Sequence, residues 1–212
     1  MRKLFFLAAA AAAFCQSCTT SLLGNPTDKA ETYAKALEIV RRNIDPERFK
    51  IYYLSFSEED KLSDNLYFVI VKMVNKDDQA FTQTLFMNGM QPSELRTVQH
   101  TFEAPTFEGT KGLDPDQIDP AKIAGQIAEA VAALPEGHSF KSVGDYTIQE
   151  EVPAGVSSFT STREVGNQKT TFVVRFTEDG KETESSAGRT STIYYEARAT
   201  VEPDGTITIK EN

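Results

Sequence analysis

The two histidines are the first side chains to test for acid–base or nucleophilic chemistry in this 212-residue chain. His100 falls in an expected strand and His138 in the expected turn that follows Glu136. A serine hydrolase also needs an orienting acid and a serine on a sharp turn, commonly within G-x-S-x-G. The chain has no such motif, and neither histidine has a partner at a recognisable spacing. We therefore predict that both histidines are non-catalytic.

Acidic side chains are the second candidates, because carboxylates bind calcium and, in pairs, hydrolyse glycosidic bonds. The segment from Asp114 to Asp119 holds three aspartates, but it lacks the glycine and the closing glutamate of a calcium loop. With 31 Asp and Glu in the chain, finding two of them near each other indicates no particular reaction. No glycine-rich loop leads into a phosphate-binding lysine. We expect no bound metal, no cofactor and no enzymatic activity.

Pairs of aromatic residues are the strongest binding candidates. In a strand, neighbouring side chains point to opposite faces, so one ring of each pair faces the core and the other the open side of a sheet. A row of tyrosines on an open face could bind a partner or a sugar. The alternative is that the open faces of two halves pack against each other and these rings are structural. The candidate binding surface comprises Tyr52, Tyr53, Tyr67, Tyr194 and Tyr195.

The N-terminal segment predicts where the protein works. Arg2 and Lys3 precede an unbroken apolar run from Leu4 to Phe14. A helix needs about 20 apolar residues to span a bilayer, so this shorter run is typical of an export signal.

The end of that run resembles the lipobox of bacterial lipoproteins, in which a small residue precedes the cysteine that is lipidated. Ser17 and Cys18 match this pattern, whereas Cys15 and Gln16 depart from its strict form. The resemblance covers the leader only. It implies a signal peptide over residues 1–17, a lipid on Cys18 and anchoring in the bacterial cell envelope, with the outer membrane as the expected site. The alternative is ordinary cleavage after the stretch from Ala8 to Ala13, which would release a soluble periplasmic protein with two cysteines near its start.

Composition excludes several other classes of protein. The chain has 22 Lys and Arg against 31 Asp and Glu, a net charge of −9, so a nucleic acid is not an expected partner. Its 14 Phe and 7 Tyr favour a folded core over disorder. Two cysteines and two histidines are too few for a zinc-finger array or a disulfide scaffold.

The first half of the mature chain predicts one helix followed by four strands. Asn25 and Pro26 provide a helix start, and the helix should end near Asp45-Pro46. Its apolar face comprises Tyr33, Leu37, Val40 and Ile44. The expected strands are residues 49–56, 66–74, 80–87 and 95–103.

The second half predicts the same order of elements. A linker over residues 105–118 leads to Asp119-Pro120, which should cap a second helix. The apolar face of this helix comprises Ile123, Ile127, Val131 and Leu134. The expected strands are residues 140–149, 170–177, 191–201 and 206–210, and residues 152–163 form either a loop or an irregular strand.

Together these elements predict an α+β fold of two tandem modules, each with one helix on an antiparallel meander of about four strands. The expected organisation is a tether at 18–25, a first module at 26–112 and a second at 113–212. The architecture is similar to tandem PepSY and β-lactamase-inhibitor-protein modules, which bind proteins. The resulting hypothesis is a non-enzymatic envelope lipoprotein that binds a protein or an envelope ligand. The alternatives are an envelope hydrolase acting on glycan or peptide, and a secreted enzyme inhibitor.

Overall fold

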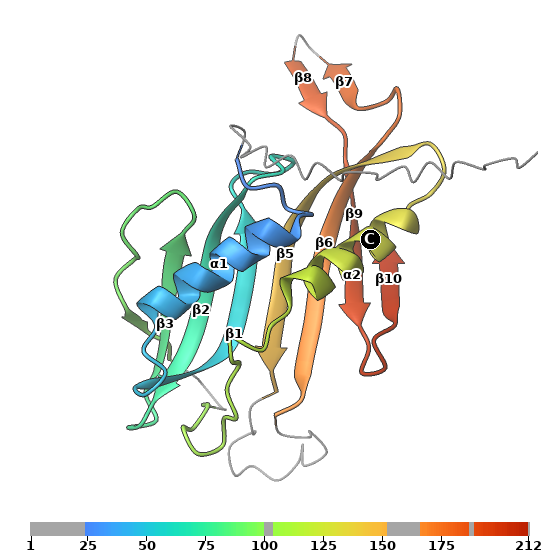
Figure 1. Cartoon of the computed structure of the whole chain (residues 1–212). Helices are drawn as coiled ribbons and strands as arrows, with labels where there is room; N and C mark the ends of the chain where they lie inside the picture. The colour runs from blue at the N-terminus through green and yellow to red at the C-terminus, as the bar shows by residue number, and fades with distance from the viewer. Residues whose placement is uncertain (1–23, 100–103, 152–165, 187–188, 212) are drawn as a thin grey trace, which may run out of the picture.

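The computed structural model describes residues 24–99, 104–151, 166–186 and 189–211 (Figure 1). Two helices and ten strands form within these ranges. The helices are α1 (Ala30–Asn43) and α2 (Pro120–Ala132). The strands are β1 (Phe49–Glu58), β2 (Leu66–Asn75), β3 (Ala80–Phe86), β4 (Arg96–Thr97), β5 (His138–Glu150), β6 (Gln168–Glu178), β7 (Thr183–Ser186), β8 (Arg189–Thr192), β9 (Tyr195–Val201) and β10 (Ile207–Glu211).

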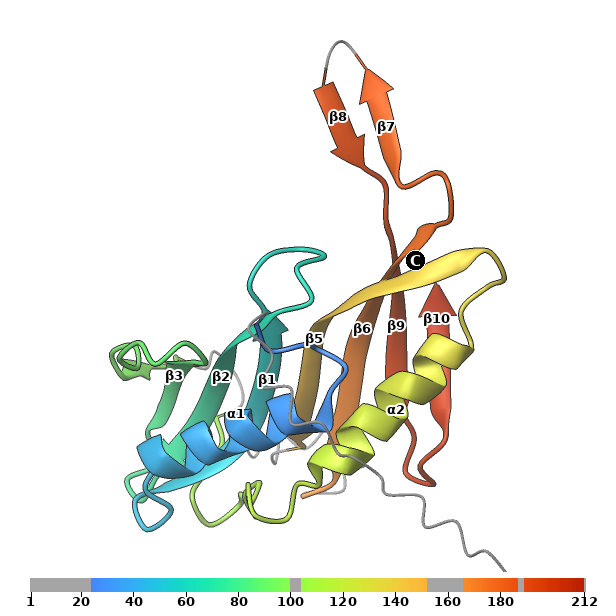
Figure 2. The same cartoon turned by 45° about the horizontal axis from the view of Figure 1, so that its top comes forward.

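Eight of the strands form a single antiparallel sheet in the order β10-β9-β6-β5-β1-β2-β3-β4. Both helices lie on one side of this sheet, α1 across the β1–β3 side and α2 across the β6, β9 and β10 side (Figures 1 and 2). The remaining strands, β7 and β8, form a separate hairpin that projects beyond the end of the sheet (Figure 2). Neither helix of the described chain is long and apolar enough to cross a bilayer.

The predicted fold class of two tandem helix-on-meander modules is wrong. The protein is mostly β, and β1 pairs with β5 from Tyr53–Gln149 to Ser57–Asp145, so the strands of both halves belong to one sheet. A separate four-stranded meander would leave β1 as an edge with unpaired backbone groups. Pairing with β5 satisfies those groups instead. The two halves lie side by side, so their open faces do not pack against each other as the structural alternative required.

The core joins both halves through a chain of aromatic rings. Tyr33 on α1 meets Phe56 on β1 and Tyr146 on β5, with ring centroids 5.4 and 5.7 Å apart. Tyr146 in turn stacks on Phe172 of β6 at 5.3 Å. Each such ring buries a large apolar area, so these contacts contribute strongly to the stability of the core. One continuous hydrophobic core therefore underlies both helices.

The start of α1 differs from the prediction. The helix begins at Ala30 with Lys29 as its N-cap, and Pro26 lies in the preceding turn. The carbonyl of Asn25 instead accepts a hydrogen bond from the backbone of Leu66 at 2.7 Å, which fixes the chain beside β2. The predicted apolar face is confirmed, because all four of its residues are buried.

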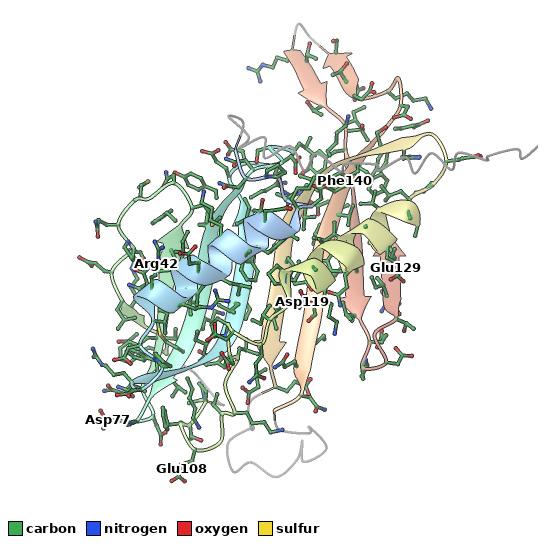
Figure 3. All side chains as sticks on the ribbon, in the orientation of Figure 1. Arg42, Asp77, Glu108, Asp119, Glu129 and Phe140 are labelled. Atoms are coloured by element: carbon green, nitrogen blue, oxygen red, sulfur yellow. The ribbon has the colours of Figure 1, made fainter. Side chains whose placement is uncertain are left out.

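The start of α2 follows the prediction. Asp119 lies at the start of α2 (Figure 3). Its carboxylate accepts a hydrogen bond from the backbone of Ala121 at 2.8 Å, and Pro120 occupies the first turn. Ile123 and Ile127 are buried, and Val131 and Leu134 pack against the core from its edge.

Several strands differ from their expected bounds. β4 is only two residues long, and residues 100–103 lie outside the described chain. The expected strand at 191–201 is divided between β8 and β9, and β7 was not predicted. The uncertain segment at 152–163 also lies outside the described residues.

Candidate functional site

The sheet has one face that neither helix covers. Leu54 and Phe56 point into the core, so Tyr53, Ser55 and Ser57 lie on the opposite side of β1. No helix or strand of the described residues is stacked on this side (Figures 1 and 2). We call it the open face. By strand alternation and register, its main residues are Thr82, Thr84, Phe68, Ile70, Lys72, Tyr53, Ser55, Ser57, Asp145, Thr147, Gln149, Lys169, Thr171, Val173, Arg175, Glu196, Arg198, Thr200, Thr208 and Lys210.

Tyr53 is the predicted binding residue that the structure places within the open face. It is half-buried and pairs across strands with Lys72 on one side and Gln149 on the other. The ammonium of Lys72 lies 4.4 Å from the centre of the Tyr53 ring, which is a cation–π contact. The bulge in β1 falls at Tyr52, between Ile51 and Tyr53.

The other predicted tyrosines lie in different environments. Tyr52 is buried, its hydroxyl has no hydrogen-bond partner in the described structure, and burial raises its pKa to about 12. The hydroxyl of Tyr67 accepts from the Asn88 amide at 3.2 Å, beside the loop after β3. The structure therefore does not bring the five tyrosines together in one row.

Tyr195 is the first residue of β9, and Tyr194 directly precedes it. The hydroxyl of Tyr194 accepts a hydrogen bond from the ammonium of Lys61 at 2.6 Å. The ring of Tyr195 stacks on Phe176 at 5.6 Å and meets the His138 ring at 5.7 Å. His138 thus packs within an aromatic cluster, whereas His100 and Cys18 lie outside the described residues.

A row of hydroxyl side chains crosses the open face perpendicular to the strands. Each member pairs with the next across the sheet, except where Ile70 of β2 stands between Thr84 and Ser55. Ser55 accepts a hydrogen bond from Thr147 at 3.1 Å. We call this set the hydroxyl row, and it comprises Thr84, Ser55, Thr147, Thr171, Thr200 and Thr208.

Arg175 is the centre of an ionic network at one end of the open face. Its guanidinium forms ion pairs with Glu58 and with Glu196, the latter at 2.8 Å. The side chains of Arg175 and Glu58 are only 13% and 3% exposed. The guanidinium also lies over Gly144, where an added Cβ would come within 2.7 Å of it. A glycine inside a strand here permits this close approach.

Asp145 lies between this network and the hydroxyl row. Burial raises the pKa of its carboxyl, and Arg198 and a hydrogen bond from Thr147 oppose that effect. The desolvated carboxyl therefore holds a proton more tightly than a free aspartate does.

Two cavities lie away from the open face. One, of about 590 Å³, lies between the end of α1 and residues 111–116, where Arg41 and Asp116 form an ion pair. The other, of about 420 Å³, lies between α1 and the loop after β3. Asp145 lines neither cavity, and the described chain contains no group of three side chains arranged to hold a metal ion.

The residues expected to form a linker pack tightly against the sheet. The buried carboxylate of Glu150 accepts hydrogen bonds from the backbones of Lys111 and Gly112, both at 2.7 Å. The backbone of Leu113 donates to the carbonyl of Ile51 at 2.6 Å. This segment fills the position beside β1 where its pairing with β5 ends.

Sequence reasoning did not identify Arg175 or the hydroxyl row. The local signal was present, because polar residues alternate with apolar ones along β1 and β5. The hydroxyl side chains line up across seven strands because of the register in which those strands pair. The sequence of a single strand does not specify that register.

No known protein family, curated protein or solved structure matches this chain.

Proposed function

We propose that this chain is a non-enzymatic, lipid-anchored protein of the bacterial cell envelope that binds a ligand through the open face. The observation that carries the proposal is the set of half-buried aromatic and aliphatic side chains on that face, where no second layer of the described protein covers them. Phe68 and Ile70 join Tyr53 there, among hydroxyl and charged groups. A surface of this kind, with apolar side chains at its centre and polar groups around them, is typical of a ligand-binding site.

The geometry supports binding over catalysis. An enzyme concentrates groups of perturbed pKa within a deep pocket. Here the desolvated carboxyl of Asp145 lies on a broad sheet face, outside both cavities. Such an arrangement suits an extended ligand that lies along a surface.

The binding surface is tested by capture from envelope extracts with the full-length tagged chain in detergent. We expect the double variant Tyr53→Ala/Lys72→Ala to retain no more than about one tenth of the captured material, because it removes the central ring and its cation. The matched control is Lys122→Ala/Tyr195→Ala, which removes the same residue types from exposed positions elsewhere. Equal capture by both double variants would show that the open face is not the binding surface.

The anchor is tested by cell fractionation. We expect Cys18→Ala to move the protein from the membrane fraction to the soluble fraction, because stable anchoring needs the acyl chains that this cysteine would carry. Cys15→Ala is the control and should leave the protein with the membrane. Membrane association of the Cys18→Ala protein equal to that of the wild type would contradict lipidation at this residue.

A further inference from the structure

We infer that the ligand of the open face is an acidic polysaccharide, which lies across the strands along the hydroxyl row. This inference rests on the proposed function, because it names the chemistry of the ligand for the same surface.

The first argument is the spacing of the hydroxyl groups. Neighbouring strands are about 4.8 Å apart, so the row from β3 to β10 repeats at that interval over roughly 29 Å. The interval is comparable with the length of one sugar unit in an extended glycan. Each hydroxyl can both donate and accept a hydrogen bond, which is the capacity that sugar hydroxyls also have.

The second argument is that much of this capacity is free. Thr147 and Ser55 bond to each other. By contrast, the side chains of Thr171, Thr200 and Thr208 have no hydrogen-bond partner within the described residues, and all three are at least partly exposed. Three neighbouring strands therefore present unused hydroxyl groups side by side.

The third argument is charge. Lys72 and Lys169 lie on one side of the hydroxyl row, two residues away along their strands, and Arg198 and Lys210 lie on the other side. With Arg175, the open face holds five cations against two acids, Asp145 and Glu196, whereas the whole chain has a net charge of −9, so this face departs from an otherwise acidic surface. Cations on both sides of a row of hydroxyls complement a chain that carries both hydroxyls and carboxylates.

The apolar centre fits the same ligand. Tyr53 lies two residues from Ser55 along β1, on the same face of the sheet. Its ring can therefore stack on the flat face of a sugar ring that lies beside the hydroxyl row. Protein interfaces obtain most of their affinity from Trp, Tyr and Arg anchors, and Ser and Thr are under-represented among them. The predominance of hydroxyl groups here favours a glycan over a protein partner.

The inference is tested by measuring binding of the full-length protein in detergent to alginate, to dextran and to poly-glutamate of matched length. We expect alginate to bind at least about tenfold more tightly than either control polymer, because only alginate combines hydroxyls with carboxylates. Added salt should weaken alginate binding, since part of the attraction is between charges on the surface.

Two double variants separate the contributions to binding. Thr171→Val/Thr200→Val removes two hydroxyls without changing side-chain shape, and Lys169→Glu/Arg198→Glu reverses two charges. We expect each to weaken alginate binding by about tenfold or more. The charge-matched control, Lys122→Glu/Arg189→Glu, changes exposed residues elsewhere and should bind alginate like the wild type.

The outcomes distinguish this inference from the proposed function. Failure to bind alginate, together with envelope capture that still depends on Tyr53 and Lys72, would overturn the glycan and leave the open face as the site for a protein. Equal binding of alginate and poly-glutamate, unaffected by Thr171→Val/Thr200→Val, would reduce the interaction to general attraction of polyanions and overturn it as well. If the wild-type protein neither bound alginate nor captured a ligand from envelope extracts, the proposed function itself would be rejected.

Discussion

Replacing Arg175 by methionine is expected to lower the free energy of unfolding by about 3–5 kcal/mol, because it leaves a buried carboxylate without its cation. Glu58 is almost completely buried, and Arg175 is its ion-pair partner. Methionine fills much of the same space, so the loss reports on charge more than on packing. Urea unfolding followed by circular dichroism measures the change.

The control is the double variant Glu58→Gln/Arg175→Met, which removes both charges. It should be more stable than Arg175→Met alone, because the buried position of Glu58 then holds no uncompensated charge, whereas Glu196, which loses Arg175 in both variants, is 33% exposed. Gly144→Ala provides an independent test, since its added Cβ would displace the guanidinium. A loss of less than about 1 kcal/mol for Arg175→Met, the usual range of an exposed ion pair, would show that this network is unimportant for stability.

Replacing Phe56 by alanine is expected to cost about 3–5 kcal/mol and to destabilise both halves of the chain together. Phe56 is 1% exposed, and its ring contacts Tyr33 of α1 and Tyr146 of β5. Because these contacts join the two halves in one core, the cavity left by the ring should weaken the β6 side as well as the β2 side. Native-state hydrogen exchange at Val71 and Val174 measures the two sides separately.

Met90→Ala is the control for this experiment. Met90 is 53% exposed, so its truncation should change stability by less than about 0.5 kcal/mol. The protein should unfold in one transition in both the wild type and Phe56→Ala. Two separate transitions, with the exchange of Val174 unchanged by Phe56→Ala, would show that the halves are independent units.

The two helices show which features of the fold the local sequence pattern can predict. The apolar spacings along α1 and α2 were sufficient to identify which residues of each helix meet the core. The start of α1 was not predictable in the same way. Asn25 resembles a helix cap in sequence, but its backbone bonds to Leu66, and a contact over such a sequence separation has no local signal.

The candidate site was also predictable only in part from the local sequence. Alternation along β1 places Tyr53 opposite Leu54 in any sheet that this strand joins. The rings of Tyr194 and Tyr195 looked equivalent to Tyr53 in sequence, yet one bonds to Lys61 and the other stacks on Phe176. Which of these residues reaches the open face depends on neighbours that the local sequence does not specify.

The sequence alone determined the helix faces and most strand positions, because each depends on residues close together in the chain. Only the tertiary structure decided that β1 pairs with β5, that the halves share one sheet, and that the hydroxyl row and Arg175 lie on its open face. The physical reason is that strand pairing is set by backbone groups that every residue carries. The choice among possible partners therefore depends on which arrangement buries all the apolar faces at once.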